Sequence, residues 1–279
     1  MTIATPTSLE GVYDALDDTP EAHLLAGGTD FMVEVNFSAR QPDAVIALGG
    51  VAELREWDRD GDVITLGAGI TYTELMAEPL AALFPGLAAA ARTVGSPQIR
   101  NAGTVGGNVA TASPAGDALP ILYALDAAVV IASRHDRRTV PIRELISGVK
   151  QTTLRPGEVV LAVQLPVLRG GQEFLKVGTR NAMVIAAANL ALVVDRDGRT
   201  VRCAIGAVAP TVRRATEAEA WVASRVDWDR PAIDDPRTYE AFGDLVAGSA
   251  DPIDDHRSTA AYRRHAVAVM ARRALLRVL

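Results

Sequence analysis

Residues 93–120 are TVGSPQIRNAGTVGGNVATASPAGDALP. Almost every residue of this run is small, turn-forming or a short polar hydrogen-bonder, so few of its side chains can pack a core. Gly103, Gly106 and Gly107 allow the backbone to approach another group closely, and Thr104 and Asn108 supply short donors and acceptors. Because successive backbone N–H groups in such turns form concavities that bind anions, the run predicts an anion-binding loop with free amides.

A second glycine-rich stretch lies upstream, where residues 23–30 are HLLAGGTD. The apolar residues 23–26 predict a short buried strand that ends at Gly27-Gly28-Thr29 and exposes backbone amides there. One such loop would be weak support for a ligand, because Gly-Gly pairs mostly mark ordinary turns. Two of them in one chain predict a ligand with a long polyanionic spine, such as a diphosphate.

These two stretches, with TASPAGD at residues 111–117, carry a resemblance to a known family. They resemble the two FAD motifs of the FAD-binding medium subunit of molybdenum hydroxylases, of the carbon monoxide dehydrogenase and xanthine dehydrogenase type. The resemblance covers essentially the whole chain, through FLKVGTR at 174–180 to the tail motif DHRSTAAYRR at 255–264. It implies FAD as the cofactor and the FAD-binding fold shared with vanillyl-alcohol oxidase and the peptidoglycan enolpyruvyl reductase.

The resemblance also implies a set of FAD-binding positions and no catalytic residue or metal ligand. These positions are Leu25, Ala26, Gly27, Gly28, Thr29, Asp30, Phe31, Val94, Ile99, Gly103, Thr104, Val105, Gly106, Gly107, Asn108, Thr111, Ala112, Asp117, Leu161 and Lys176. Val94 departs from the pattern, because some relatives place an aromatic residue on the flavin there.

Three charged members of this set have a plain structural alternative. Asp30 either caps its local turn or faces the hydroxyl groups of the ribityl chain or the adenosine. Asp117 either caps a helix or contacts FAD hydroxyls, and the two roles are compatible. Lys176 is either a solvated strand lysine or, as the resemblance implies, a cation beside the flavin that stabilises negative charge on the reduced ring.

Composition excludes several classes of function. The net charge of −6 and the pI of about 5.3 argue against nucleic acid or anionic lipid as the main partner. The single cysteine, Cys203, excludes an intrachain disulfide and a cysteine-ligated iron–sulfur cluster in this chain. The four histidines show no zinc-site spacing. No apolar run reaches membrane-spanning length, and we expect a cytoplasmic protein without a membrane span.

The element pattern predicts an α+β chain in two parts. We expect a two-part FAD-binding domain over residues 1–168, then a smaller domain over 169–279 with an antiparallel sheet and helices. Strands are expected at 23–26, 44–48, 54–58, 63–67, 127–132, 159–165, 174–178, 185–194 and 200–208. Helices are expected at 8–16, 71–83, 87–94, 117–125, 216–224, 237–247 and 259–279, the last with an apolar stripe at Val267, Met270, Ala271, Ala274 and Val278.

A classical nicotinamide dehydrogenase is disfavoured. Neither glycine-rich loop fits G-x-G-x-x-G at the start of a helix with an acidic residue about twenty positions further on. The GAG at residues 67–69 instead predicts a strand end before a helix capped at Thr71.

The resemblance therefore implies an oxidoreductase subunit. In that family, a large subunit with a molybdenum cofactor oxidises the substrate, and a small [2Fe-2S] subunit passes the electrons to FAD and on to NAD, oxygen or a quinone. A self-contained flavin oxidoreductase of the same fold is one alternative. A degenerate FAD-fold protein that acts only as a scaffold is another.

Overall fold

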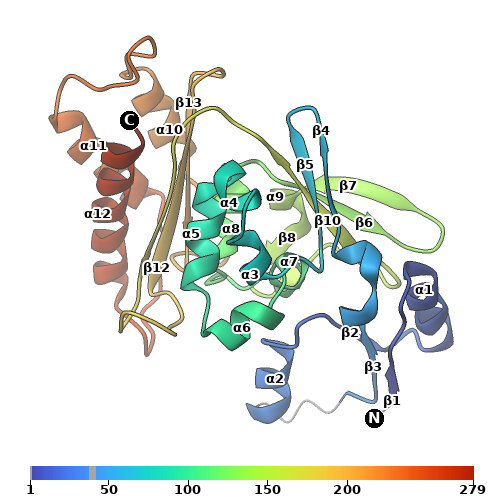
Figure 1. Cartoon of the computed structure of the whole chain (residues 1–279). Helices are drawn as coiled ribbons and strands as arrows, with labels where there is room; N and C mark the ends of the chain where they lie inside the picture. Colours follow the sequence, from blue (N-terminus) through green and yellow to red (C-terminus); the bar gives the residue numbers. More distant parts are fainter. Residues whose placement is uncertain (1, 38–41) are drawn as a thin grey trace.

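The structure is a computed structural model that describes residues 2–37 and 42–279. A small parallel sheet near the N-terminus lies below a larger antiparallel sheet, and a group of short helices separates both from a third sheet (Figure 1). The third sheet carries the C-terminal helices on its outer face. This mixture of helices and sheets confirms the α+β prediction.

The N-terminal sheet has three parallel strands in the order β1-β3-β2. They are β1 (Thr2–Ala4), β2 (His23–Leu25) and β3 (Ala44–Ala47). Helix α1 (Leu9–Asp18) is capped by the Ser8 hydroxyl, which accepts from the Gly11 amide at 3.2 Å. Helix α2 (Phe31–Phe37) follows β2 and was not predicted.

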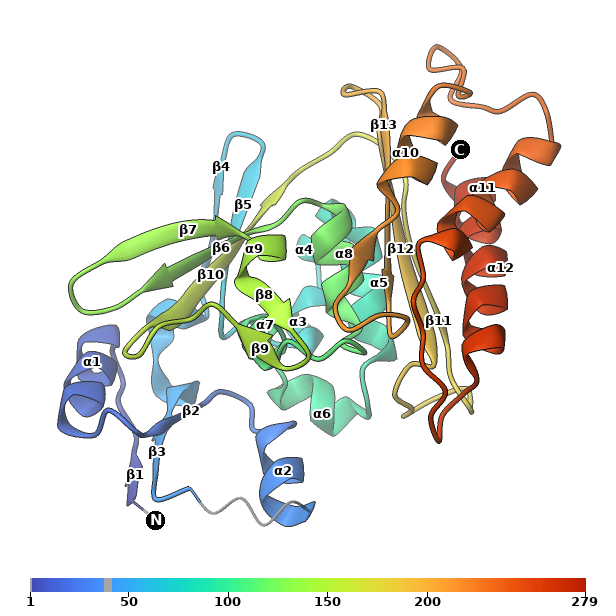
Figure 2. The same ribbon diagram turned by 180° about the vertical axis from the view of Figure 1, so that it is seen from behind.

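The second sheet has five antiparallel strands in the order β4-β5-β10-β6-β7. They are β4 (Trp57–Asp60), β5 (Val63–Gly67), β6 (Ala128–Ala132), β7 (Arg137–Pro141) and β10 (Val159–Pro166). The strand predicted at 54–58 begins later, because 3-10 turns occupy Leu48–Gly50 and Ala52–Leu54. A small hairpin, β8 (Ile146–Gly148) and β9 (Gln151–Thr152), lies beside α7 (Figure 2).

Short helices fill the space between the sheets. They are α3 (Tyr72–Leu75), α4 (Leu80–Leu83), α5 (Pro85–Thr93), α6 (Pro97–Ala102), α7 (Val105–Thr111), α8 (Ala118–Ala124) and α9 (Ile142–Leu145). The single helix predicted at 71–83 is wrong, because Pro79 interrupts it. Thr71 does cap α3 as predicted, in a capping box with Glu74.

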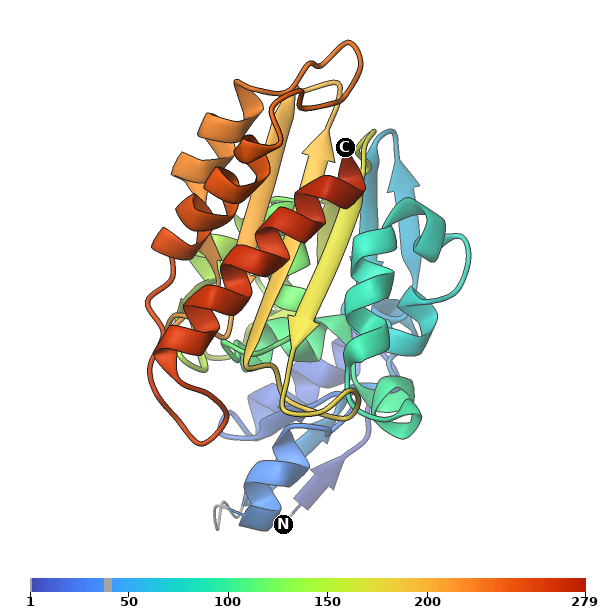
Figure 3. The same ribbon diagram turned by 90° about the vertical axis from the view of Figure 1, so that its left-hand side faces the viewer.

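The C-terminal sheet has four antiparallel strands in the order β11-β12-β13-β14. They are β11 (Gln172–Val177), β12 (Ala188–Asp195), β13 (Thr200–Gly206) and β14 (Arg213–Arg214). Its outer face is covered by α10 (Thr216–Ala223), α11 (Arg237–Gly248) and α12 (Ala260–Val278), with α12 crossing the sheet diagonally (Figure 3).

The inner face of this sheet packs on α5 and α8, so β12 is buried along its whole length. The predicted stripe of α12, including Val267 and Ala274, is buried within the chain. These findings confirm the predicted antiparallel sheet with three helices. In the part of the chain that the structure describes, no helix is both long enough and apolar enough to cross a membrane.

Candidate functional site

The two glycine-rich stretches meet at backbone contact. A β-carbon added at Gly27 would lie only 1.7 Å from the carbonyl oxygen of Ala102, at the end of α6. Ala26 also lies beside Gly107, at an ordinary contact distance, because a β-carbon at Gly107 would lie 3.8 Å from Cβ of Ala26. Two segments about 75 residues apart in the sequence therefore form one surface, and only a residue without a side chain fits at Gly27.

The second motif differs from the prediction, because it folds as the short helix α7 and not as an open loop. Thr104 is its N-cap, and its hydroxyl accepts from the Gly107 amide at 3.0 Å. The amides of Val105 and Gly106 donate to the carbonyl oxygens of Ile70 and Ala68. The expectation that these amides are free for an anion is wrong, because the chain itself uses them.

The contacts of Ala68 extend this packing to the central strand of the second sheet. A β-carbon at Gly106 would lie 2.4 Å from Cβ of Ala68, so glycine is required for the approach. The Ala68 amide in turn donates to the carbonyl oxygen of Leu161 in β10, at 2.8 Å. Strand β10 thereby fixes α7 through the turn at residues 67–70.

The first motif, in contrast, keeps its amides available. Within residues 2–37 and 42–279, the amides of Gly27, Gly28 and Thr29 donate to no acceptor. Gly28 has φ of +70°, a backbone conformation that glycine adopts without strain. Neighbouring free amides in such a turn suit an anion such as a diphosphate.

Asp30 has a partner that the sequence analysis missed. Lys150, in the turn between β8 and β9, places its Nζ atom 3.0 Å from Oδ2 of Asp30 and 2.7 Å from Oε1 of Glu34. Partial burial opposes the lysine's charge, but the hydrogen bonds that Lys150 donates to Glu34 and Asp30 raise the pKa of Lys150 above its ordinary value. The carboxylate at the end of the first motif is therefore paired with a cation, which it shares with Glu34.

Asn108 presents an unsatisfied oxygen. Its Oδ1 atom is buried and has no hydrogen-bond partner in the described part of the chain. Its Nδ2 atom lies close to Gly116, where a β-carbon would be only 2.7 Å away. A buried polar atom without a partner is costly, so this oxygen fits a ligand with hydroxyl donors, such as the ribityl chain of FAD.

A buried ion pair connects the second motif to the C-terminal sheet. Nζ of Lys176 in β11 lies 2.5 Å from Oδ2 of Asp117, and the two side chains are only 8% and 6% exposed. Asn189 of β12 donates to Oδ1 of Asp117 at 3.1 Å, and the Thr93 hydroxyl donates to Oδ2 at 3.1 Å. Burial raises the pKa of Asp117, while Lys176, Asn189 and Thr93 oppose that rise.

This cluster contradicts the plain structural roles that were considered for Asp117 and Lys176. Asp117 occupies the N-cap position of α8, but its side chain caps no amide among the described residues. The cap hypothesis is therefore wrong, because the carboxylate is turned toward Lys176. Lys176 is not a solvated strand lysine either, since its ammonium also donates to the carbonyl oxygen of Thr93 at 3.2 Å.

The remaining predicted positions lie around these two centres. Ile99 and Gly103 belong to the turn of α6 that faces the first motif, and Val94 caps the end of α5. Ala112 ends α7, and its carbonyl oxygen accepts from the Lys150 amide at 3.1 Å. The other positions lie on elements given above: Leu25 at the end of β2, Phe31 at the start of α2, and Val105 and Thr111 at the ends of α7.

Three polar residues of the site were missed by the sequence analysis: Thr93, Lys150 and Asn189. Asn189 carried a usable signal, because it is a lone amide in the otherwise apolar strand ANLALVV. The sequence around Lys150 gave no sign of its role, because its two acidic partners are 120 and 116 positions away.

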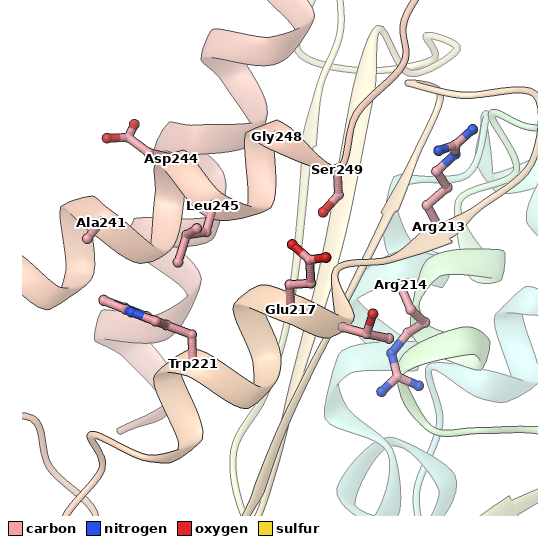
Figure 4. A pocket seen from close by; sticks show the side chains of 10 residues that line it. Arg213, Arg214, Glu217, Trp221, Ala241, Asp244, Leu245, Gly248 and Ser249 are labelled. Carbon is pink, nitrogen blue, oxygen red and sulfur yellow. The ribbon is translucent and has the colours of Figure 1, made fainter.

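A groove of about 780 Å³ lies elsewhere, between α10, α11 and β14 (Figure 4). Trp221 and Leu245 form apolar parts of its lining, and Glu217 and Ser249 lie between them and the two arginines. Arg214 is turned away into an ion pair with Glu219 at 2.6 Å. None of the predicted FAD positions lines this groove, so it is separate from the site described here.

Comparison with protein families gives two matches that together span nearly the whole chain. The family of the FAD binding domain in molybdopterin dehydrogenase matches residues 1–168. The family of the CO dehydrogenase flavoprotein C-terminal domain matches residues 173–278. The prediction of FAD as the cofactor is confirmed by the first match.

Individual proteins agree with these matches. The chain is 30% identical to the nicotine 6-hydroxylase medium subunit of Paenarthrobacter nicotinovorans, over 98% of this chain and 95% of the relative. It is 30% identical to the carbon monoxide dehydrogenase medium chain of Hydrogenophaga pseudoflava, over 91% and 88%. A crystal structure of quinoline 2-oxidoreductase from Pseudomonas putida 86 superposes with a TM-score of 0.91 at 25% identity, over 99% and 96% of the two chains.

Proposed function

This chain belongs to the family of FAD-binding medium subunits of molybdenum hydroxylases, and from that premise we propose that it is the electron-transfer subunit of a heteromeric hydroxylase or dehydrogenase. It takes electrons from iron–sulfur clusters on a partner subunit and passes them through FAD to an external acceptor. The partners are a large subunit with the molybdenum cofactor and a small [2Fe-2S] subunit. The acceptor is NAD, oxygen or a quinone.

The observation that best supports an FAD site at these residues is the packing of Gly27 on Ala102. It aligns the free amides of Gly27, Gly28 and Thr29 with α7 and with the unsatisfied Oδ1 of Asn108. In the proposed arrangement, the amides hold the diphosphate and Asn108 accepts from a ribityl hydroxyl. The remaining predicted positions are proposed as further FAD contacts.

The FAD supplies the redox chemistry, because its isoalloxazine ring accepts and releases the electrons. The chain contributes binding, orientation and electrostatics. Lys176 would place its ammonium beside the ring. The Asp117 carboxylate and the Thr93 carbonyl oxygen hold this ammonium, and Asn189 in turn holds Asp117. Such a fixed cation needs no reorganisation when negative charge develops nearby.

The need for partners follows from the composition of the chain. Its one cysteine, Cys203, is fully buried, and burial raises the pKa of its thiol well above the ordinary value. In the proposed function, electrons therefore arrive from a carrier on another subunit. The unpaired thiol also suits the reducing cytoplasm, and we place the complex there.

The test begins with the visible spectrum of the chain co-expressed with its partner subunits and purified as the complex. We expect one FAD per medium subunit, released on denaturation and identified by chromatography. Reduction by the substrate of the large subunit should bleach the flavin band only when the small subunit is present. A chain that is reduced by substrates without any partner would instead be a self-contained flavin oxidoreductase.

The substitution Gly107→Trp tests whether the proposed loops hold the flavin. Its matched control is Gly49→Trp, at an exposed glycine with no atom within 4 Å of an added β-carbon. We expect Gly107→Trp to lose FAD while it still co-purifies with its partners, and Gly49→Trp to keep both properties. Full flavin retention in Gly107→Trp would place the cofactor elsewhere.

A further inference from the structure

Lys150 connects the two halves of the proposed FAD site. Its backbone amide donates to the carbonyl oxygen of Ala112 at the end of α7, and its ammonium binds Asp30 and Glu34 on the other side. The β8–β9 turn that carries it lies beside α7 (Figure 2). One residue thus contacts both the end of the second motif and the end of the first.

The backbone of Lys150 is itself unusual. Its φ is +53°, in the left-handed region where a side chain costs energy and glycine does not. Such a conformation points to a functional constraint only where the contacts of the side chain supply one. The ion pairs of Lys150 with Asp30 and Glu34 are such contacts.

The choice of lysine is also unusual in this chain. Of 28 basic residues, only Lys150 and Lys176 are lysines, and the rest are arginines. Both lysines pair with carboxylates of the candidate site, Asp30 and Asp117. An ammonium is a compact point charge, and at each of the two sites it places one positive charge against a carboxylate.

We infer that Lys150 is a positioning residue for FAD, an inference that rests on the proposed function. Lys150 offsets the charge of Asp30 beside the first motif, so that the free amides there can bind an anion. Asp30 directly follows Gly27-Gly28-Thr29. Without Lys150, the carboxylate of Asp30 would repel a diphosphate at the same loop. The lysine acts through Asp30 and need not touch the cofactor.

The experiment titrates FAD into protein that has been stripped of flavin, within the complex, and follows the quenching of flavin fluorescence. We expect Lys150→Met to weaken FAD binding about five- to tenfold at low salt, the effect of one unneutralised charge near a partly exposed site. Lys150→Arg should retain most of the affinity because it keeps the charge. High salt should reduce the difference in FAD affinity between Lys150→Met and the unmodified protein, because it screens the exposed charges.

The decisive variant removes the carboxylate that lysine neutralises. Asp30→Asn combined with Lys150→Met should bind FAD more tightly than Lys150→Met alone, a rescue that a merely structural role of the lysine would not give. The matched control is Arg134→Met, which breaks ion pairs with Asp14 and Asp17 on α1 away from the motifs. It should leave FAD affinity unchanged.

Two outcomes would overturn the inference while the proposed function stands: equal FAD affinity of Lys150→Met and the unmodified protein, or no rescue in the double variant. Failure of the unmodified protein to bind FAD at all would overturn the proposed function and this inference together. A thermal unfolding scan of each apoprotein separates lost affinity from lost folding.

Discussion

Gly27 and Ala102 touch so closely that a β-carbon on Gly27 would lie 1.7 Å from the carbonyl oxygen of Ala102. This distance is far below any real carbon–oxygen contact, and both atoms are held by backbone. The contact fixes the first motif relative to α6 and hence relative to α7. The geometry of the proposed FAD site therefore depends on one missing methyl group.

Gly27→Ala should separate the two motifs. Relieving the overlap requires a backbone shift, which costs about 1–3 kcal/mol in a packed region. We expect a lower free energy of unfolding of the apoprotein and a loss of FAD affinity of about five- to 150-fold, in line with that cost. Equilibrium unfolding in urea and FAD titration measure the two effects. Gly49→Ala, at an unobstructed position, should change neither the free energy of unfolding nor the FAD affinity. If Gly27→Ala also left both unchanged, the close contact with Ala102 would be refuted.

Thr104→Val should weaken α7 without changing its size. The hydroxyl of Thr104 accepts from the Gly107 amide at 3.0 Å, and loss of such a cap costs about 1 kcal/mol. Thr104→Ser keeps the hydroxyl and should retain most of the stability. Urea unfolding of the apoprotein provides the comparison, and identical curves for Val and Ser variants would show that the cap contributes nothing.

Elements with strong local signals were predictable from the sequence. The Ser8 cap of α1, the Thr71 cap of α3 and the apolar stripe of α12 depend on neighbours three or four residues apart. The alternating and apolar runs of the C-terminal sheet predicted β11, β12 and β13 within a few residues, whereas the two-residue strand β14 was not predicted. The two glycine-rich motifs could likewise be located from composition alone.

Elements that depend on distant partners were not predictable. Helix α7 contains two glycines and has poor helix propensity, yet it forms because Ala68 and Ile70 accept its first amides. The ion pair of Asp117 with Lys176 joins residues 59 positions apart. Only the folded chain brings these groups together, so local patterns assigned Asp117 to a helix cap and left Lys150 unnoticed.

Lys176→Met should be among the most destabilising substitutions at the site. It leaves the buried carboxylate of Asp117 without its cation, which costs about 3–5 kcal/mol. Adding Asp117→Asn to Lys176→Met removes the stranded charge and should recover a large part of the loss. Urea unfolding of the three apoproteins measures this, and a double variant no more stable than Lys176→Met would show that charge pairing is not the cause.

The tail motif should control stability in acid. Partial burial opposes ionisation of Asp255, but hydrogen bonds from the Arg257 amide, Arg263 and the Ser258 amide lower its pKa from 3.8 to about 2. Arg263 is buried and also donates to the carbonyl oxygen of Ala207 at 2.8 Å, which ties the tail to the loop after β13. The ionised carboxylate thus holds a contact between distant parts of the C-terminal sheet and its helices.

The sign of the pH effect follows from that lowered pKa. Because the folded state binds a proton on Asp255 less readily than the unfolded state, its contribution to stability is fully present above about pH 4 and is lost as the pH falls toward 2. Asp255→Asn lacks this titration, so it should be less stable at pH 7 and its free energy of unfolding should fall less steeply between pH 4 and 2. Urea unfolding at a series of pH values measures the two slopes. Parallel slopes would mean that Asp255 titrates alike in both states and that its contact with Arg263 does not stabilise the fold.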